Sequence, residues 1–217
     1  MKGDIVILEE HHKHAAKLIV SKIAADINKT TRRFTISIAG ESGSGKSEMG
    51  AAIASELNKY EIKSIVLGQD DYFILPPRSN DARRREDPDW LGPHIEVKLE
   101  ILEKNLQDAL MGENFITKPV VDYDKNIIEK ETINLTGVKV VIAEGTYTSL
   151  LKSIDKKVFI EANRLDTLEH RKKRNRGNEV GDPFIEHILE TEHKIIAGHK
   201  LLSDFVITKD YNVVIVD

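Results

Sequence analysis

The strongest constraint on the fold is the run GESGSGKS at residues 40–47, which matches the phosphate-binding loop pattern G-x-x-x-x-G-K-[ST]. The apolar, β-branched run Phe34–Ala39 comes directly before it and predicts a buried strand. Directly after it, apolar residues recur at helical spacing at Met49, Ala52, Ile53 and Leu57. This order places a helix N-terminus and successive backbone N–H groups where phosphate oxygens can bind. The alternative interpretation is a glycine-rich turn that holds no ligand.

The composition indicates one soluble globular domain and excludes several kinds of site. Of the 217 residues, 40% are apolar and 31% are charged, so the chain is long enough to bury a sizeable core. The net charge of −4 offers no electrostatic basis for binding nucleic acid or a membrane. The chain has no cysteine, which excludes disulfides, thiolate metal sites and a cysteine nucleophile. Because there is neither an apolar run of about 18 residues nor a signal-peptide core, we expect a cytoplasmic protein.

Strands and helices are predicted to alternate along the chain, which favours a three-layer α/β fold with a mainly parallel sheet. The prolines between Leu75 and Pro93 predict a loop, and a turn at 124–126 predicts a small β-hairpin within residues 116–133. We expect a single domain over residues 1–217, with an N-terminal extension at 1–32 packed on it and a helical lid at 165–182. Further strands are expected at 63–67, 138–143, 157–160, 205–207 and 213–216, and further helices at 15–28, 96–111, 165–175 and 183–201.

The phosphate-binding loop indicates a nucleoside triphosphate as ligand. In such a loop the Lys46 ammonium reaches the β- and γ-phosphates, and the Ser47 hydroxyl can ligate Mg²⁺. The loop alone does not separate a kinase from a GTPase, a helicase or an ATP-driven switch. The residues expected to bind the nucleotide are Gly40, Glu41, Ser42, Gly43, Ser44, Gly45, Lys46, Ser47 and Glu48.

Two acidic residues at predicted strand ends favour a kinase. Asp70 follows the strand at 63–67, where it could orient an acceptor hydroxyl and accept its proton; the alternative is an Asx-type cap. Adjacent side chains of an extended chain point in opposite directions, so Asp71 is not expected to share this role. Glu144 ends the strand at 138–143, where its carboxylate could hold Mg²⁺ directly or through water.

A third feature is the basic segment that contains Arg171 and Arg174. These two residues are three positions apart, so on a helix they share one face. Placed over the phosphates, two guanidinium groups would offset the negative charge of the transition state. The glycines that follow would let such a helix move as a lid. The alternative interpretation is an ordinary solvated helix face.

Six short motifs occur in one order along the chain. They are GESGSGKS at 40–47, QDDYF at 69–73, DPDW at 87–90, KPVVDYD at 118–124, VVIAEG at 140–145 and DTLEHRKKR at 166–174. With these motifs the chain resembles the uridine kinase and phosphoribulokinase family of P-loop small-molecule kinases over about residues 33–208, and the first 30 residues fall outside the resemblance.

The resemblance implies an ATP- and Mg²⁺-dependent kinase, and it makes a homo-oligomer plausible. By match, Asp70 becomes the catalytic base and a neighbour of the Mg²⁺ ion, whose ligands are Ser47 and Glu144. Lys46 joins the catalytic residues, and Arg171 and Arg174 become the lid arginines. The residues expected to contact the acceptor are Asp70, Tyr72, Phe73, Tyr123 and His170.

The departures from the family pattern concern the acceptor. Gly92 or Pro93 stands near the position where uridine kinases carry a ribose-binding aspartate, and Val121 replaces a tyrosine of the base pocket. Uridine is therefore the family default and no inference from these residues. Arg78 and the run Arg83–Arg85 would suit a phosphorylated or carboxylated acceptor, as in phosphoribulokinase-like or pantothenate kinase-like chemistry. Alternatively, these arginines pair with Asp81, Glu86 and Asp87 on a solvated loop.

The leading hypothesis is a kinase that moves the γ-phosphoryl group of ATP to a hydroxyl of a small metabolite, with a nucleoside as the first candidate. A second hypothesis is a regulatory module that binds a nucleotide without an acceptor, although such a module needs neither Asp70 nor the lid arginines. A third is a P-loop protein that acts on nucleic acid, against which the acidic charge balance argues.

Overall fold

The computed structural model describes residues 6–168, 172 and 181–216 of the chain. A central sheet contains six strands in the order β2-β5-β1-β6-β7-β8, and a separate hairpin contains β3 and β4. The helices are α1 (Glu10–Lys29), α2 (Lys46–Lys59), α3 (Pro77–Glu86), α4 (Leu99–Leu110) and α6 (Pro183–Ile196), with 3-10 turns η1 (Gln69–Tyr72), η2 (Thr148–Leu150) and η3 (His199–Leu202). The strands are β1 (Phe34–Gly40), β2 (Ser64–Gly68), β3 (Phe115–Asp122), β4 (Ile127–Asn134), β5 (Val140–Glu144), β6 (Lys156–Ile160), β7 (Phe205–Ile207) and β8 (Val213–Ile215).

The central sheet is parallel except for its last pair, β7 and β8, which confirms the expected mainly parallel sheet. β1 lies in the middle and is buried along its whole length, as its unbroken apolar and small-residue sequence predicts. Its two neighbours, β5 and β6, are separated from it in sequence by long crossovers. The phosphate-binding loop therefore leaves the sheet at its centre.

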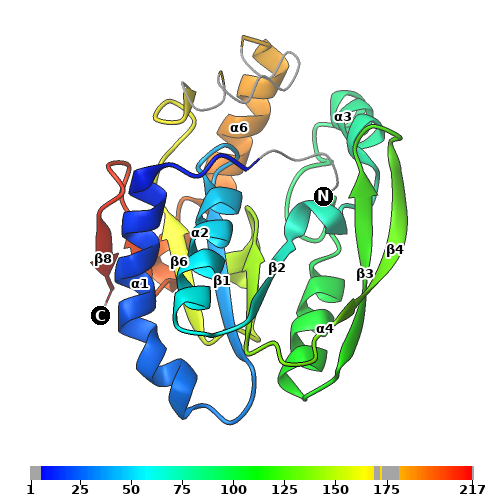
Figure 1. The fold of residues 1–217 in the computed structure, drawn as a ribbon. Coiled ribbons are helices and arrows are strands. Elements are labelled where there is room, and N and C mark those ends of the chain that lie inside the picture. Colours follow the sequence, from blue (N-terminus) through cyan, green and yellow to red (C-terminus); the bar gives the residue numbers. More distant parts are fainter. Residues whose placement is uncertain (1–5, 169–171, 173–180, 217) are drawn as a thin grey trace.

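Helices cover both faces of the sheet, which gives the three layers expected from the sequence (Figure 1). α1 and α2 pack side by side on one face, where Ile19, Ile23 and Ile53 are part of one hydrophobic core. α4 packs on the opposite face together with the hairpin β3–β4, which extends beyond the β2 edge in Figure 1. Among the described residues, no helix has the length and the apolar character needed to cross a membrane.

α1 follows the helical spacing of apolar residues seen in the sequence, with one difference. Ala15, Ile19, Ile23 and Ile27 are buried against α2 and the sheet. Leu18, which lies at helical spacing from Ala15, is 38% exposed, and the neighbouring Ala16 and Val20 are buried instead. The buried face is thus rotated slightly from the one that the apolar spacing predicts, because α1 contacts both α2 and β8.

The segment between Leu75 and Pro93 contains a helix, α3, so the prediction of a loop was wrong. Pro77 occupies the first turn of α3, where proline is compatible with a helix because that N–H needs no intrahelical partner. The helix has no apolar stripe, since its buried side chain is Asn80 and its half-buried side chain is Arg84. Hydrophobic periodicity could not reveal a helix that polar contacts fix in place.

The hairpin agrees with the expectation, and the end of the last long helix differs from it. The hairpin is present, and Asn126 takes the left-handed φ of 56° that its turn requires. The last long helix ends at Ile196 and continues as η3, so the predicted end at Leu201 was too late. The predicted lid helix at 165–175 lies largely outside the described residues, and His170, Arg171 and Arg174 are among those that the structure does not describe.

Candidate active site

The loop at residues 40–47 wraps from the end of β1 into the first turn of α2. Gly45 precedes α2 with a φ of 89°, a left-handed conformation that favours glycine. The Ser44 N–H donates to the Glu41 carbonyl over 3.1 Å, which closes the loop on itself. The Lys46 ammonium donates to the same carbonyl over 2.8 Å. The motif predicts that the other loop N–H groups and the N-terminus of α2 bind phosphate oxygens.

α6 contacts this loop through two consecutive residues. The Ser42 N–H donates to Glu192 Oε2 over 3.4 Å, so a carboxylate oxygen accepts from a backbone group of the loop. His193 Nδ1 pairs with the carboxylate of Glu41, which also accepts from the Arg164 N–H over 2.9 Å. Glu41 is 5% exposed, so its side chain supports the loop from inside. The helix that follows the expected lid region is therefore bonded directly to the phosphate-binding loop.

Glu192 is a buried acid next to the phosphate-binding loop. Burial raises the pKa of its carboxyl, and the nearby Arg84 guanidinium partly offsets this effect. Tyr147 lies close to the same charges and is 1% exposed, and its hydroxyl has no hydrogen-bond partner among the described residues. Glu192 is not among the site residues predicted from the sequence. A signal was present, because the buried positions of α6 are Ile188, Leu189, Glu192 and Ile196, which places an acid on the apolar face.

Asp70 and Asp71 both lie in η1 but differ in their surroundings. Asp70 is partly exposed at the end of β2. Asp71 is 3% exposed, pairs with the Lys118 ammonium and accepts from the Val121 N–H over 3.0 Å, so it ties the hairpin to the sheet. The conclusion that the two aspartates have different roles agrees with this geometry. Its premise was wrong, because the chain here is a 3-10 turn and not extended.

Glu144 ends β5 between the two strands that carry the other candidate groups. It is in register with Ile38 of β1 and with Gly68 of β2, and its side chain is partly exposed. A Cβ atom on Gly68 would lie 2.8 Å from Glu144 Oε1, so glycine at this position leaves room for the carboxylate. Parallel strands end at one edge of the sheet, and Glu144 and Asp70 therefore lie on the same side of the phosphate-binding loop.

Gly145 makes this edge compact. Its φ is 156°, and a Cβ atom there would lie 2.2 Å from Gln69 Cβ, so any side chain would displace the turn that carries Asp70. The Gln69 side chain accepts from the Tyr147 N–H over 2.8 Å and joins the ends of β2 and β5. The turn of Asp70 and the strand of Glu144 are thus held together by direct contact.

An open Mg²⁺ site fits these side chains. Mg²⁺ is usually bound by one or two carboxylates, with phosphate oxygens and water as the other ligands. Ser47, Asp70 and Glu144 are partly exposed oxygen donors at one edge of the sheet, and the space beside Glu144 is kept clear by Gly68. No cluster of three or more metal-binding His, Asp or Glu residues occurs in the described part of the chain.

The expected acceptor residues separate into two groups. Tyr72 is 0% exposed and donates its hydroxyl to Asn105 Oδ1 over 3.0 Å inside the core, so the prediction that it contacts an acceptor was wrong. Its burial follows from the 3-10 turn, which directs it toward α4. Phe73 is partly exposed and lies against the Arg84 guanidinium, 5.8 Å from the ring centroid. Tyr123 is 44% exposed beside the hairpin turn.

The arginines of α3 are paired with acids of the same chain. Arg83 and Arg85 bind Asp87 and Asp81 one turn away, and Arg85 also reaches Asp182 at the start of α6. Arg84 forms an ion pair of 2.7 Å with Glu96, whose side chain is 1% exposed. The pairing alternative of the sequence analysis is thus confirmed for Asp81 and Asp87, on a helix rather than on a loop. Glu96 was missed, since no sequence signal distinguishes it from a solvated acid.

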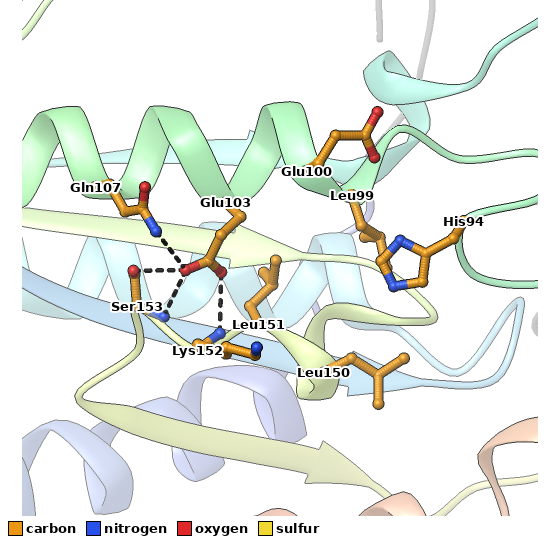
Figure 2. A pocket seen from close by; sticks show the side chains of 9 residues that line it. All are labelled: His94, Leu99, Glu100, Glu103, Gln107, Leu150, Leu151, Lys152 and Ser153. Carbon is orange, nitrogen blue, oxygen red and sulfur yellow. Dashed lines mark hydrogen bonds between the residues drawn. The ribbon is translucent and has the colours of Figure 1, made fainter.

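A cavity of about 410 Å³ lies between α4 and residues 150–153, away from the phosphate-binding loop. Figure 2 shows that Glu103, one of the two acids of this cavity, points toward the segment Lys152–Ser153, from which it accepts hydrogen bonds. Neither the loop nor Asp70 nor Glu144 lines this cavity, so it is not part of the candidate active site.

Sequence comparison relates this chain to known kinases. A model of the phosphoribulokinase/uridine kinase family matches residues 35–182. A uridine kinase of Ureaplasma parvum serovar 3 is 31% identical over 203 residues, which cover 78% of this chain and 94% of that protein. The bifunctional α-galactosidase/sucrose kinase AgaSK of Mediterraneibacter gnavus is 28% identical over 192 residues, and the match spans 83% of this chain but only 20% of that protein.

A solved structure extends the comparison to the whole fold. The D-glycerate 3-kinase of Cryptococcus neoformans aligns with a TM-score of 0.62 and 14% identity over 95% of this chain and 98% of that chain. At this identity the likeness concerns the fold, and the family follows from the sequence matches. The chain belongs to the phosphoribulokinase/uridine kinase family of kinases.

Proposed function

We propose that this protein is an ATP-dependent kinase that transfers the γ-phosphoryl group to a hydroxyl of a small, uncharged metabolite, with a nucleoside as the first candidate. The observation that carries the proposal is the position of Asp70, a partly exposed carboxylate on the turn that Gln69 ties to the end of β5. A nucleotide-binding switch needs no such group, whereas phosphoryl transfer to an alcohol needs one to orient the hydroxyl and accept its proton.

In the proposed reaction, the acceptor oxygen forms a bond to the γ-phosphorus while the bond from that phosphorus to the β–γ bridging oxygen breaks. The acceptor proton passes to the Asp70 carboxylate, and the products are ADP and a phosphate ester. Lys46 and the N–H groups of the loop hold the phosphates in line. Ser47 and Glu144 would hold Mg²⁺, which when bound neutralises charge on the phosphate oxygens.

The contacts of Arg78 and of the run Arg83–Arg85 favour an uncharged acceptor. Arg83, Arg84 and Arg85 each form an ion pair with an acid, and Arg78 donates to the carbonyl of Asp124. A phosphorylated or carboxylated acceptor would have to break one of these pairs before an arginine could bind it. The two relatives matched by sequence act on neutral acceptors by name, uridine and sucrose, whereas the D-glycerate 3-kinase that shares the fold acts on an anion.

The test is a screen of acceptors with ATP and Mg²⁺, with ADP release followed by a coupled assay and the product identified by mass spectrometry. Nucleosides, neutral sugars, sugar phosphates, glycerate and pantothenate form the panel. We expect ADP release only when a neutral polyol is present. If no acceptor changes the rate of ADP release, the result would support a regulatory nucleotide-binding module. If ADP is released only with an anionic acceptor, the result would support a kinase for a phosphorylated or carboxylated acceptor.

A further inference from the structure

We propose that the first turn of α1 is part of the donor-nucleotide site: His11 and Tyr211 line a cavity for the nucleobase, and the pair His12–Tyr211 positions the phosphate-binding loop. Neither end of the chain that supplies these residues belongs to the segment matched by the family, residues 35–182. The inference rests on the proposed binding of a nucleoside triphosphate at the loop.

The strand order determines on which side of the loop the nucleoside lies. Asp70 and Glu144 follow β2 and β5, which lie on one side of β1. The γ-phosphate must face these two residues, because they are the candidate base and metal ligand. The triphosphate crosses the loop, so its nucleoside end points to the other side of β1, toward β6, β7 and β8.

A cavity of about 110 Å³ lies on that side, directly beside the loop residue Gly43. His11 and Tyr211 lie together at this cavity, with ring centroids 3.9 Å apart and planes tilted by 46°. Aromatic side chains stack on bases of any type. Carboxylates at the cavity can accept from an exocyclic amine and the Lys209 ammonium can donate to a ring nitrogen. The complete lining is Glu9, His11, Gly43, Ala162, Asp166, Thr167, Lys209 and Tyr211.

His12 and Tyr211 pack against the phosphate-binding loop at Gly45. The Glu9 N–H donates to His12 Nδ1 over 3.1 Å, so the neutral ring carries its proton on Nε2. That nitrogen lies 3.2 Å from the Tyr211 hydroxyl and donates to it. His12 is 0% exposed. Burial, with Glu48 and Glu9 nearby, raises the pKa of Tyr211 to about 12, so its hydroxyl remains protonated.

The same pair determines the space around Gly45. A Cβ atom on Gly45 would lie 2.9 Å from the Tyr211 hydroxyl and 3.3 Å from His12 Nε2. Gly45 is the residue directly before α2 in the phosphate-binding loop, so both side chains pack against the backbone that is proposed to hold the phosphates. His12 and Tyr211 are positioning residues for this backbone, whereas the His11 ring and the Tyr211 ring face the nucleobase.

The experiment separates contact with the base from support of the loop. Calorimetry would measure the Kd of the full chain, its His11→Ala and Tyr211→Phe variants and a His14→Ala control for ATP and for inorganic tripolyphosphate, which has no base. His14 is exposed on the same helix and does not line the cavity. Melting temperatures of all four proteins would show whether each variant is folded.

We expect His11→Ala to weaken the binding of ATP about tenfold, since it removes a ring that contacts the base. Its Kd for tripolyphosphate should not change. Tyr211→Phe keeps the ring but removes the hydroxyl, so it should weaken ATP and tripolyphosphate by the same factor. The control should bind both like the unmodified chain. Equal losses of both ligands in His11→Ala, or no loss of either in the two variants, would overturn the proposal.

The result is also distinguishable from a failure of the proposed function. If the variants change ATP binding as expected but the protein phosphorylates no acceptor, the proposed kinase activity is contradicted. The proposed donor site is then still supported. Acceptor-dependent turnover together with variants that bind ATP normally would contradict the donor site alone. If neither ATP nor tripolyphosphate binds to the unmodified chain, both proposals are wrong.

Discussion

Asp70 and Asp71 show how two identical neighbouring side chains acquire different roles. Asp71 is one half of a buried ion pair with Lys118, and both side chains are almost fully shielded from water. Asp70 is partly exposed at the rim of the sheet. The 3-10 turn directs one carboxylate inward and leaves the other accessible, so the first contributes to stability and the second is available for chemistry.

This difference leads to a prediction with a built-in control. Asp70→Asn should lower kcat by about 10²–10⁴-fold, because the amide cannot accept the acceptor proton, and it should leave ATP binding and the melting temperature unchanged. Asp71→Asn should instead destabilise the fold by about 3–5 kcal/mol, because it removes the buried negative charge that pairs with the Lys118 ammonium and leaves only the more distant Glu131 carboxylate. Turnover assays, calorimetry with ATP and thermal denaturation would measure the three quantities. Full activity in Asp70→Asn would show that this carboxylate is not the base.

Glu192 makes stability depend on pH. Burial raises the pKa of its carboxyl above the ordinary value of 4.5, so the folded chain binds this proton more tightly than the unfolded chain. The protonated Glu192 carboxyl makes its full contribution to the free energy of unfolding below about pH 4.5, and this contribution is lost as the pH rises through the folded-state pKa. The glutamine of a Glu192→Gln variant does not ionise, so this variant does not lose stability as the pH rises. Its melting temperature relative to the unmodified chain should therefore increase with pH above about 4.5.

The measurement is thermal denaturation of both proteins at several pH values between 4 and 8. Glu190→Gln is the matched control, because Glu190 lies on the same helix and a hydrogen bond from Lys194 lowers the pKa of its carboxyl. For this control the relative melting temperature should not increase with pH. A pH-independent difference for Glu192→Gln would mean that the carboxyl ionises equally in the folded and unfolded chains.

Among the helices, α3 is held by polar contacts rather than by an apolar face. Arg84 reaches Glu96, which also accepts from the Asn80 amide over 2.9 Å, and Trp90 donates to the Asn80 carbonyl oxygen over 2.8 Å. These contacts connect α3 to the segment before α4. The link from α3 to α6 depends on the exposed pair Arg85–Asp182 and on the Arg85 guanidinium over the Phe184 ring.

Neighbouring arginines of α3 should therefore differ in their effect on stability. Arg84→Met removes the counter-charge of the buried Glu96 and should cost about 3–5 kcal/mol of unfolding free energy. Arg85→Met removes two ion pairs at the surface, with Asp81 and Asp182, which water and salt screen, so the melting temperature should change little. Denaturant unfolding of the two variants measures the difference. Equal losses in both would show that the charge of the helix, rather than the buried pair, holds α3.

At the scale of the whole molecule, α1 is part of the main core. Its buried face contacts α2, and residues of both helices form one cluster with β1 and β7. The N-terminal segment is thus packed as closely as the elements of the family core, although the family match begins at residue 35. A chain without this helix would expose an apolar face of α2 and of the sheet.

Removal of residues 1–29 should consequently abolish cooperative folding. Uncovering Ile19, Ile23 and Ile27 together with their partners on α2 would cost more than the few kcal/mol by which small domains are stable. The expected result is a truncated chain that is aggregated or has no thermal transition, whereas the full chain unfolds in one step. A truncated chain that unfolds cooperatively and binds ATP would show that α1 is an accessory element.

Much of the fold was predictable because its signals are local. The apolar runs of β1, β5 and β6 and the spacing of apolar residues in α1 and α4 indicate each element without knowledge of its partner. The phosphate-binding loop is equally local, since eight consecutive residues carry it. The elements that were missed or misjudged are those fixed by distant partners, such as α3 by Glu96 and the Tyr72 side chain by Asn105.

The sequence by itself determined that this chain forms a parallel α/β sheet with a phosphate-binding loop, and it placed acids at the ends of two strands. Only the tertiary structure decided which of Asp70 and Asp71 is accessible, that Glu192 bonds the loop, and that His12 and Tyr211 from opposite ends of the chain meet behind Gly45. The physical reason is that periodicity and motif spacing report contacts within a few turns of chain. Burial, ion pairing and close packing depend on residues that the fold alone brings together.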